Sequence, residues 1–341
     1  MMKSAIVGCG GIAVVHAQSL IQRQIGEIVG FADIKPERAQ AYAQRFGGRA
    51  YSSLEEMLSA EKPDVLHICT PHYLHVPMAV YALGQGVHVF MEKPPVISTQ
   101  QYRQLAEAVQ QAEKRIGFCF QNRYNKSVQL IKGLLASGEA GKVLGARGFV
   151  TWCRNEKYYT ESGWRGSLTT EGGSALANQS VHTLDLLNYF LGKPVWTDAR
   201  MANHHLQGVI ETEDTVEAYI RYENVNASFY ATTAYCADVP PLIEIACENR
   251  TIRMEGERVT YFYPDARVEL PEVEVTAPLG KSYWGSGHAG CIEDFYESIK
   301  TQKRYEQDLE GIEDTLKLML AVYESARTDS RIYTDSIAAA L

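Results

Sequence analysis

Short apolar runs alternate with amphipathic stretches through the first third of the chain. The runs lie at residues 4–7, 28–32, 64–69, 87–91 and 116–120. Runs of this length and composition are typical of buried parallel strands, and the stretches between them have helical spacing. Helices are expected at 36–46, from a capped start near 52–56, at 76–84 and at 98–114. The alternation predicts a doubly wound α/β domain with a parallel sheet.

The pattern changes after residue 125. A helix at 126–137 is followed by segments rich in β-branched and aromatic residues, without the helices that parallel crossovers need. These segments lie at 142–154, 195–205, 213–222, 226–236, 241–248 and 250–255. Further helices are expected at 174–191, 289–300 and 311–328. The sequence predicts a second α/β domain with an open, mostly antiparallel sheet, so that residues 1–121 form one domain and 122–341 the other.

Composition and charge narrow the function. With 341 residues, 45% of them hydrophobic and 22% charged, the chain has the profile of an ordinary globular protein. Its net charge of −8 without a basic block argues against nucleic acid and anionic membranes as partners. No apolar stretch reaches the length of a membrane span, and no cleavable leader is evident, so a cytoplasmic location is expected. The seven cysteines are scattered and never spaced C-x-x-C, which disfavours disulfide scaffolds and zinc ribbons.

The first apolar run leads directly into a glycine-rich turn, Gly8-Cys9-Gly10-Gly11-Ile12-Ala13. In this G-x-G-x-x-A pattern Gly8 permits the tight turn, Gly10 lets the backbone approach a pyrophosphate, and Ala13 lets the helix pack on the strand. The second run ends at Asp33, where an acid can bind ribose hydroxyls. Asp33 would repel a 2′-phosphate, so NAD is favoured over NADP, although Lys35 nearby softens that preference.

Two further segments follow the ends of predicted parallel strands, the edge where ligands bind in such sheets. Thr70-Pro71 with His75 follows the strand at 64–69, and Glu92-Lys93-Pro94-Pro95 follows the strand at 87–91. The second segment places Lys93 where the nicotinamide end of a cofactor would lie. The alternative is that Lys93 is an exposed lysine in a loop with no role in binding, because charged residues are mostly exposed.

The helix expected at 174–191 carries Asn178, His182 and Asp185 at positions i, i+4 and i+7, which share one face of an α-helix. Its glycine-rich leader contains Trp164 and Arg165. A buried histidine in a helix is often only a packed core residue. A metal site is disfavoured, because the chain shows no second ligand cluster, and His204 and His205 would point to opposite faces of a strand.

The chain resembles the glucose-fructose oxidoreductase / inositol dehydrogenase family (Gfo/Idh/MocA) over essentially its full length. The motifs that carry the resemblance are Gly8-Cys9-Gly10-Gly11-Ile12-Ala13, Thr70-Pro71 with His75, Glu92-Lys93-Pro94, and Gly172-Gly173 followed by Asn178, His182 and Asp185. The resemblance implies an N-terminal Rossmann domain, and a C-terminal domain whose open sheet commonly forms the interface of a homodimer or homotetramer. Members usually have aspartate four residues before the helix histidine. Asn178 departs from this and resembles a subgroup that includes nucleotide-sugar dehydrogenases.

The resemblance and the motifs together imply three sets of site residues. The catalytic residues would be Lys93, His182 and Asn178. The cofactor would be bound by Gly8, Gly10, Gly11, Ile12, Asp33, Thr70, Pro71, His75, Glu92, Lys93, Trp164 and Arg165. The substrate, a polyhydroxylated small molecule, would be bound by Lys93, Asn122, Arg123, Tyr124, Asn178, His182 and Asp185, and no metal is expected.

The function expected is NAD(P)-dependent transfer of hydride to or from a secondary hydroxyl of a sugar, cyclitol or sugar derivative. His182, with an ordinary histidine pKa of about 6.5, suits the acid/base role, and Lys93 either polarises the substrate oxygen or acts as the base. Two alternatives stay open. One is a NAD-dependent glycosidase that works by transient oxidation and elimination, and the other is a non-catalytic sensor of sugar or cofactor.

Overall fold

The computed structural model describes residues 1–274 and 285–339. The chain forms two compact units, one of Met1–Gln121 with the described part of Ala277–Ile312, and one of Asn122–Thr276 with Glu313–Leu341. The sequence predicts that residues 122–341 form one domain, but in the structure residues 285–312 belong to the first unit. The reason is packing, because helix α9 (His288–Thr301) lies against α1 (Ala13–Arg23) and contributes the fully buried Phe295 and Tyr296.

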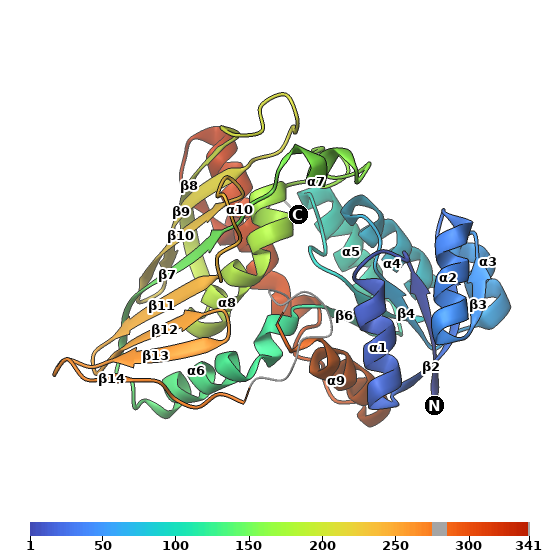
Figure 1. Cartoon of the computed structure of the whole chain (residues 1–341), viewed down its shortest axis with the longest axis horizontal. Helices are drawn as coiled ribbons and strands as arrows, with labels where there is room; N and C mark the ends of the chain where they lie inside the picture. Colours follow the sequence, from blue (N-terminus) through green and yellow to red (C-terminus); the bar gives the residue numbers. More distant parts are fainter. Residues whose placement is uncertain (275–284, 340–341) are drawn as a thin grey trace. The chain divides into compact units, whose positions relative to one another are not determined.

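The first unit is built on a six-stranded parallel sheet. Its strands are β1 (Met2–Val7), β2 (Gly26–Ala32), β3 (Arg49–Tyr51), β4 (Val65–Ile68), β5 (His88–Met91) and β6 (Ile116–Phe118). Their order is β3-β2-β1-β4-β5-β6, and every pairing is parallel. Figure 1 labels β2, β3, β4 and β6 of this sheet. This order is that of dinucleotide-binding sheets, which bind ligands at the carboxyl ends of the strands.

Local signals place the helices between these strands. After α1, the helices are α2 (Pro36–Phe46), α3 (Leu54–Glu61), η1 (His72–Leu74), α4 (His75–Gly84) and α5 (Thr99–Gln111), and η2 (Gln121–Tyr124) follows β6 at the start of the second unit. Pro36 starts α2, and the side chains of Ser53 and Ser98 accept N–H bonds at the starts of α3 and α5. The predicted alternation of strand and helix is confirmed.

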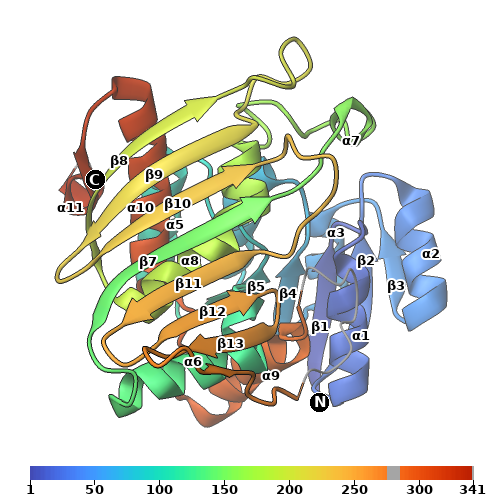
Figure 2. The ribbon, with the colours of Figure 1, turned by 60° about the vertical axis from the view of Figure 1, so that its left-hand side comes forward.

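The second unit is built on a nine-stranded mixed sheet. Its strands are β7 (Val143–Thr151), β8 (Pro194–Ala202), β9 (Thr215–Tyr222), β10 (Asn226–Thr232), β11 (Leu242–Cys247), β12 (Thr251–Glu255), β13 (Arg258–Phe262), β14 (Val268–Glu269) and β15 (Ile332–Tyr333). Their order is β14-β13-β12-β11-β7-β10-β9-β8-β15. Among the strands that the structure describes, only β7 and β10 pair in parallel (Figure 2), so the predicted mostly antiparallel sheet is confirmed.

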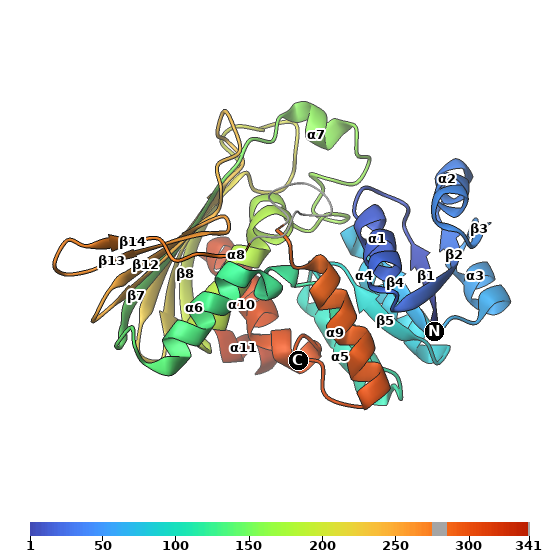
Figure 3. The same ribbon diagram turned by 60° about the horizontal axis from the view of Figure 1, so that its bottom comes forward.

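Helices cover one face of this second sheet. Alternate residues of the central strands are buried, as in the pattern of β9, where Val216, Ala218 and Ile220 are inside. Helices α6 (Lys126–Ser137), α8 (Val181–Leu191) and α10 (Leu309–Thr328) lie along that face (Figures 1 and 3). On the opposite face, seen in Figure 2, none of the described helices lies. The remaining helices are α7 (Glu156–Thr160) and α11 (Thr334–Ala339).

Two sequence-based expectations need correction here. The helix expected at 174–191 begins as a π-helical segment, Ser174–Ser180, and becomes α-helical only at Val181. The reason is that side chains bind its first N–H groups: Glu213 accepts from Leu176, and the Tyr323 hydroxyl accepts from Ala177. The strand expected at 195–205 ends at Ala202, because Asp214 accepts the backbone N–H of His205 and bends the chain into a turn.

Among residues 1–274 and 285–339, no helix combines the length and the apolar character needed to cross a membrane.

Candidate active-site residues

The glycine-rich turn between β1 and α1 has the geometry that a dinucleotide loop requires. Gly8 has a φ of +87°, and a Cβ there would lie 2.7 Å from the carbonyl carbon of Cys69, so no larger residue fits. A Cβ on Gly10 or Gly11 would meet nothing within 4 Å, so the backbone is open to an approaching group. No side chain caps α1 at Ile12, which leaves its first N–H groups free of side-chain acceptors and suited to an anion.

Asp33, at the carboxyl end of β2, closes this turn. Its Oδ2 accepts the backbone N–H of Cys9 at 2.8 Å and its Oδ1 accepts that of Lys35 at 2.8 Å. Each carboxylate oxygen retains a lone pair, so the side chain can order the loop and still accept a ribose hydroxyl. The Tyr42 hydroxyl donates to the Gly10 carbonyl at 2.6 Å and fixes the other side of the turn.

The Thr70 and His75 segment joins two of the predicted cofactor loops. His75 lies with Nδ1 2.9 Å from the Pro94 carbonyl oxygen and Nε2 2.9 Å from the Thr70 carbonyl oxygen. A neutral ring donates to only one of them, while burial lowers the pKa of His75 despite both backbone bonds. The Thr70 hydroxyl is buried with no hydrogen-bond partner among the described residues. A buried hydroxyl of this kind is suited to bind a ligand.

Glu92 and Lys93 follow the carboxyl end of β5. Glu92 is buried, and its Oε1 lies 2.9 Å from Nε2 of His16, a fully buried histidine of α1. Its Oε2 accepts the backbone N–H of Lys93 at 3.2 Å. Burial alone would raise the pKa of Glu92, but the hydrogen bond and charge of His16, with His288 and Lys93, hold it below its ordinary value. Lys93 itself is partly exposed, and the Lys93–Pro94 bond is cis.

In the second unit, Asn178 is held by a buried carboxylate that the sequence did not single out. The Asn178 amide donates to Oε1 of Glu171 at 2.5 Å, and Oε2 of Glu171 accepts from Gly166 N–H at 2.6 Å and from the Ser174 hydroxyl at 2.5 Å. Burial raises the pKa of Glu171 against the effect of these bonds. His182 lies four residues on, partly exposed in the first turn of α8. The hydrogen bond thus ties Asn178, in the π-helical segment, to the loop that precedes this segment.

A second buried carboxylate, that of Glu213, binds the same π-helical segment. Oε1 of Glu213 accepts Leu176 N–H at 2.9 Å and the Tyr323 hydroxyl at 3.1 Å. Burial raises the pKa of Glu213 to about 7, although the hydrogen bond from Leu176 opposes the shift and Glu171 adds to it. Gly173 has to be glycine, because a Cβ there would overlap the Tyr323 hydroxyl.

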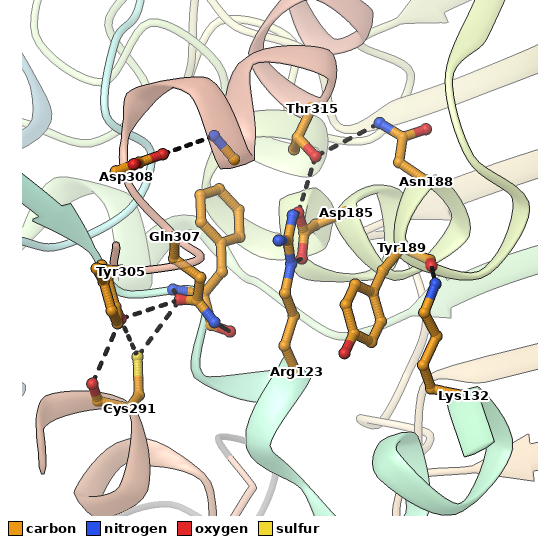
Figure 4. A network of polar contacts seen from close by, with 12 residues as sticks. Arg123, Lys132, Asp185, Asn188, Tyr189, Cys291, Tyr305, Gln307, Asp308 and Thr315 are labelled. Carbon is orange, nitrogen blue, oxygen red and sulfur yellow. Dashed lines mark hydrogen bonds and ion pairs between the residues drawn. The ribbon is translucent and has the colours of Figure 1, made fainter. Parts of the chain in front are cut away.

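Asp185 pairs with Arg123 inside the second unit (Figure 4). Arg123 donates from Nε to Oδ2 of Asp185 at 2.9 Å and from a terminal nitrogen to Oδ1 at 2.5 Å, while the Thr315 hydroxyl donates to Oδ1 at 2.8 Å. The Asp185 side chain is only 1% exposed. Asp185 is thus buried, whereas Asn178 and His182 are partly exposed. The side chains of Arg123 and Asp185, both predicted to bind substrate, bind each other.

The remaining predicted residues of the second unit lie on the loop before the π-helical segment and in η2. The guanidinium of Arg165 stacks between the rings of Trp164, at 4.8 Å, and Tyr158, at 4.5 Å, and its Nε is buried without a partner among the described residues. Asn122 and Tyr124 belong to η2, both partly exposed, and the Asn122 side-chain oxygen is likewise buried without a partner.

Comparison with known families identifies the chain. Residues 2–120 match the oxidoreductase family with an NAD-binding Rossmann fold (GFO_IDH_MocA), and residues 128–253 match the GFO/IDH/MocA C-terminal domain. The chain therefore belongs to this oxidoreductase family, and the predicted family and NAD-binding Rossmann fold are confirmed. The open backbone at Gly10 and Gly11, the uncapped start of α1 and the unpartnered Thr70 hydroxyl fit NAD as its cofactor.

Curated relatives share about half of their length with this chain. The D-glucoside 3-dehydrogenase of Escherichia coli is 31% identical over 57% of this chain and 55% of that protein. The glucose-6-phosphate 3-dehydrogenase of Bacillus subtilis is 28% identical over 58% of this chain and 56% of that protein. The chain thus covers less than two thirds of either relative.

A solved structure matches over nearly the whole chain. The WlbA dehydrogenase of Bordetella pertussis, in complex with NADH and UDP-GlcNAcA, has a TM-score of 0.85 and 29% identity, with 97% of this chain and 98% of that chain covered. Levoglucosan dehydrogenase in complex with NADH and levoglucosan has a TM-score of 0.86 at 21% identity, covering 98% of this chain and 99% of that chain, and shares the fold.

Sequence reasoning missed Glu171, Glu213 and His16. Glu171 carried one local signal, since it stands in the glycine-rich leader seven residues before Asn178. Glu213 and His16 carried none, because their partners Leu176 and Glu92 are distant in the sequence.

Proposed function

We propose that the protein is an NAD-dependent dehydrogenase that oxidises a secondary hydroxyl of a pyranose sugar or sugar derivative. The hydroxyl that we propose is the one on carbon 3. The observation that carries the proposal is the segment in which Glu171 holds Asn178 four residues before His182, in a chain of an NAD-binding oxidoreductase family. Two relatives named as 3-dehydrogenases of glucose derivatives support the position of the hydroxyl. The complex of a relative with UDP-GlcNAcA supports a derivatised sugar.

The proposed division of labour follows from the chemistry of three side chains. NAD, when bound, supplies the hydride acceptor. His182 takes the hydroxyl proton, because an imidazole titrates near neutral pH. Lys93 donates to the substrate oxygen and stabilises the negative charge that develops on it. Asn178 cannot take a proton, so it orients the substrate by neutral hydrogen bonds, with Glu171 fixing its amide.

The cofactor and substrate residues are assigned as follows. Gly10, Gly11, Ile12 and Thr70 bind the cofactor phosphates and Asp33 its ribose. Arg165 and Asn122, each with a buried polar atom that lacks a partner among the described residues, contact cofactor or substrate. Asp185 serves the reaction only through Arg123, because the pair is bidentate and the carboxylate is buried.

We also propose that the uncovered face of the nine-stranded sheet joins copies of the chain into a homodimer or homotetramer. The lining of a hollow on this face includes the aromatic residues Phe149, Trp196, Tyr219 and Tyr230 and the charged residues Arg200, Arg331, Asp198 and Glu217. Aromatic and arginine side chains are enriched in protein interfaces. Sedimentation of Tyr219→Glu would yield smaller particles than the wild type, and an unchanged mass would remove this face as the interface.

The function is tested by reduced-nicotinamide absorbance with NAD and a panel of sugars, glycosides, sugar phosphates and nucleotide sugars. The product of an active substrate is then examined by NMR for a 3-keto group. Free sugar released without accumulation of reduced cofactor would establish the glycosidase instead. No turnover of any sugar in either direction, with cofactor binding intact, would favour the sensor.

A further inference from the structure

A continuous chain of buried hydrogen bonds runs through the first unit and ends at Glu92. The Ser4 hydroxyl lies 2.6 Å from the Tyr296 hydroxyl, which lies 2.9 Å from Nε2 of His67. Nδ1 of His67 lies 2.9 Å from Nδ1 of His16, and Nε2 of His16 lies 2.9 Å from Oε1 of Glu92. All of these side chains are buried, and they come from β1, α9, β4, α1 and the end of β5. We call them the polar chain.

The polar chain is not built as a metal site, although His16, Glu92 and Cys119 bring three ligand atoms within 4.8 Å of one another. At 2.9 Å the His16 and Glu92 atoms share a proton, and the other nitrogen of His16 already bonds His67. Burial raises the pKa of the Cys119 thiol well above its ordinary value, so this thiol is neutral at neutral pH.

Counting protons gives the polar chain a direction. With Glu92 ionised and both imidazoles neutral, His16 donates to Glu92, His67 donates to His16, Tyr296 donates to His67, and Ser4 donates to Tyr296. Every donor then points toward the carboxylate. A proton added at His16 reverses every bond beyond it, because a protonated His16 donates from both ring nitrogens and His67 must then accept. The tautomer of His67 therefore reports the protonation of His16.

The surroundings favour the ordering in which Glu92 is ionised. Burial lowers the pKa of His67 well below its ordinary value, so this ring stays neutral. Among the described residues, the charged or titratable groups that interact with Glu92 include His16, Lys93, His288, His67, Cys69, His75 and Cys119. Of these, Lys93 is the residue that follows Glu92 and donates its backbone N–H to it. A buried carboxylate beside a lysine stabilises the ammonium form.

We propose that His16, His67 and Tyr296 are positioning residues that keep Glu92 ionised and thereby keep Lys93 an ammonium, so that Lys93 serves as a donor to the substrate oxygen and His182 as the base. This deepens the proposed function and rests on it for the role of Lys93. The physical step from the polar chain to the charge of Lys93 is independent of any substrate, and it is tested without one.

The test is competitive acylation of the purified protein across pH, with the extent of Lys93 labelling read by mass spectrometry, since only the neutral amine reacts. Lys62, exposed in the same unit, is the internal reference. Glu92→Gln removes the charge, and His16→Phe removes the donor that holds the charge. In both variants the pH of half-labelling of Lys93 should fall by about one unit or more, equivalent to about tenfold more neutral amine at a fixed lower pH. His16→Gln, which keeps a donor, should restore the wild-type value. An unchanged midpoint in folded Glu92→Gln and His16→Phe overturns the proposal.

A measurement on the wild type covers the case in which a variant does not fold. In ¹⁵N-histidine-labelled protein at neutral pH, the proposal requires a proton on Nε2 of His16, the nitrogen that donates to Glu92. A His16 without a proton on Nε2 would make Glu92 the donor, and so a protonated carboxyl, and would overturn it. The protein could fail to reduce NAD with every sugar tested and still show the labelling shift and the required histidine protonation. That result would refute the proposed dehydrogenase but would leave the link from the polar chain to Lys93 intact.

Discussion

The Asn178 amide nitrogen lies 2.5 Å from Oε1 of Glu171, and this hydrogen bond places a carboxylate directly behind a residue that cannot itself take a proton. Glu171 is fully buried and also binds Gly166 N–H and the Ser174 hydroxyl. It therefore ties together the loop before the π-segment, the start of that segment and the side chain that we assign to substrate orientation. A carboxylate so bonded is costly to remove, because each of its partners would be left unsatisfied.

Replacing Glu171 tests this arrangement. Glu171→Ala should lower kcat/KM by about 100-fold, because Asn178 loses its anchor, and should lower the free energy of unfolding by about 1–3 kcal/mol, because buried donors lose their acceptor. Glu171→Gln keeps an acceptor and should lose less of both. Steady-state kinetics and urea unfolding measure the two effects. Glu211→Gln, an exposed change nearby in the same unit, is the matched control and should leave both near the wild-type values. Equal kinetics for Glu171→Ala and the control would separate Glu171 from the active site.

The glycine-rich turn offers a pair of matched substitutions. Gly8→Ala should destabilise the first unit, because its φ of +87° disfavours alanine and the Cβ would meet the Cys69 backbone at 2.7 Å. Gly10→Ala adds a Cβ to open space, so the stability should stay within about 0.5 kcal/mol of the wild type while NAD binding weakens by about tenfold or more. Thermal unfolding and titration calorimetry with NAD measure the two effects. Gly10→Ala with unchanged NAD affinity would mean that the cofactor does not approach this backbone.

The buried Asp185–Arg123 pair makes a prediction about stability. Asp185→Asn leaves Arg123 buried without its counter-charge and should cost about 3–5 kcal/mol of unfolding free energy. The exposed pair of Arg327 with Glu324, 70% and 38% exposed, is the matched control, and Glu324→Gln should cost about 1 kcal/mol or less. Urea unfolding of both variants compares them. A loss as small as that of the control would mean that Asp185 is open to solvent or ligand, as the sequence first suggested.

Glu213 makes the stability of the fold depend on pH. Burial raises its pKa to about 7 from an ordinary value near 4.5, so the fold favours the protonated carboxyl. The stability that this provides is complete below about pH 4.5 and is lost as the pH rises through 7, on the order of 2–3 kcal/mol. Glu213→Gln is neutral at every pH and should not show this loss. The measurement is the difference in unfolding free energy between wild type and variant from pH 5 to about 8, and parallel curves would contradict it.

Local spacing in the sequence was enough for the parallel sheet of the first unit and for the family, but not for the place of residues 285–312 in that unit. Gly8, Gly10 and Asp33 act through backbone geometry and through bonds to near neighbours, so their roles can be read from a short stretch. The strand and helix alternation is equally local, which is why the parallel sheet could be predicted. The pairing of β7 with β10 could not, because parallel register depends on contacts between distant segments.

The candidate site was only partly visible in the sequence, for a related reason. Asn178, His182 and Asp185 share a face in an α-helix, but Glu213 and Tyr323 convert its first turns to a π-helix from positions far along the chain. Thr315 reaches Asp185 across 130 residues, and Tyr296 reaches His67 across 229. Helical periodicity contains no signal for such partners, so the division of these polar residues between substrate contact and internal support needed the structure.

The central claim is tested most directly by mixing the protein with NAD and a panel of glucose derivatives, and by recording reduced-nicotinamide absorbance for wild type, Lys93→Met and His182→Asn. The account predicts that absorbance rises with at least one sugar derivative in the wild type, that a 3-keto product forms, and that kcat falls by at least about 100-fold in each variant while NAD still binds. Wild-type turnover that persists unchanged in Lys93→Met and His182→Asn would contradict the assignment of both residues. Cofactor binding without turnover of any sugar in either direction would contradict the dehydrogenase itself.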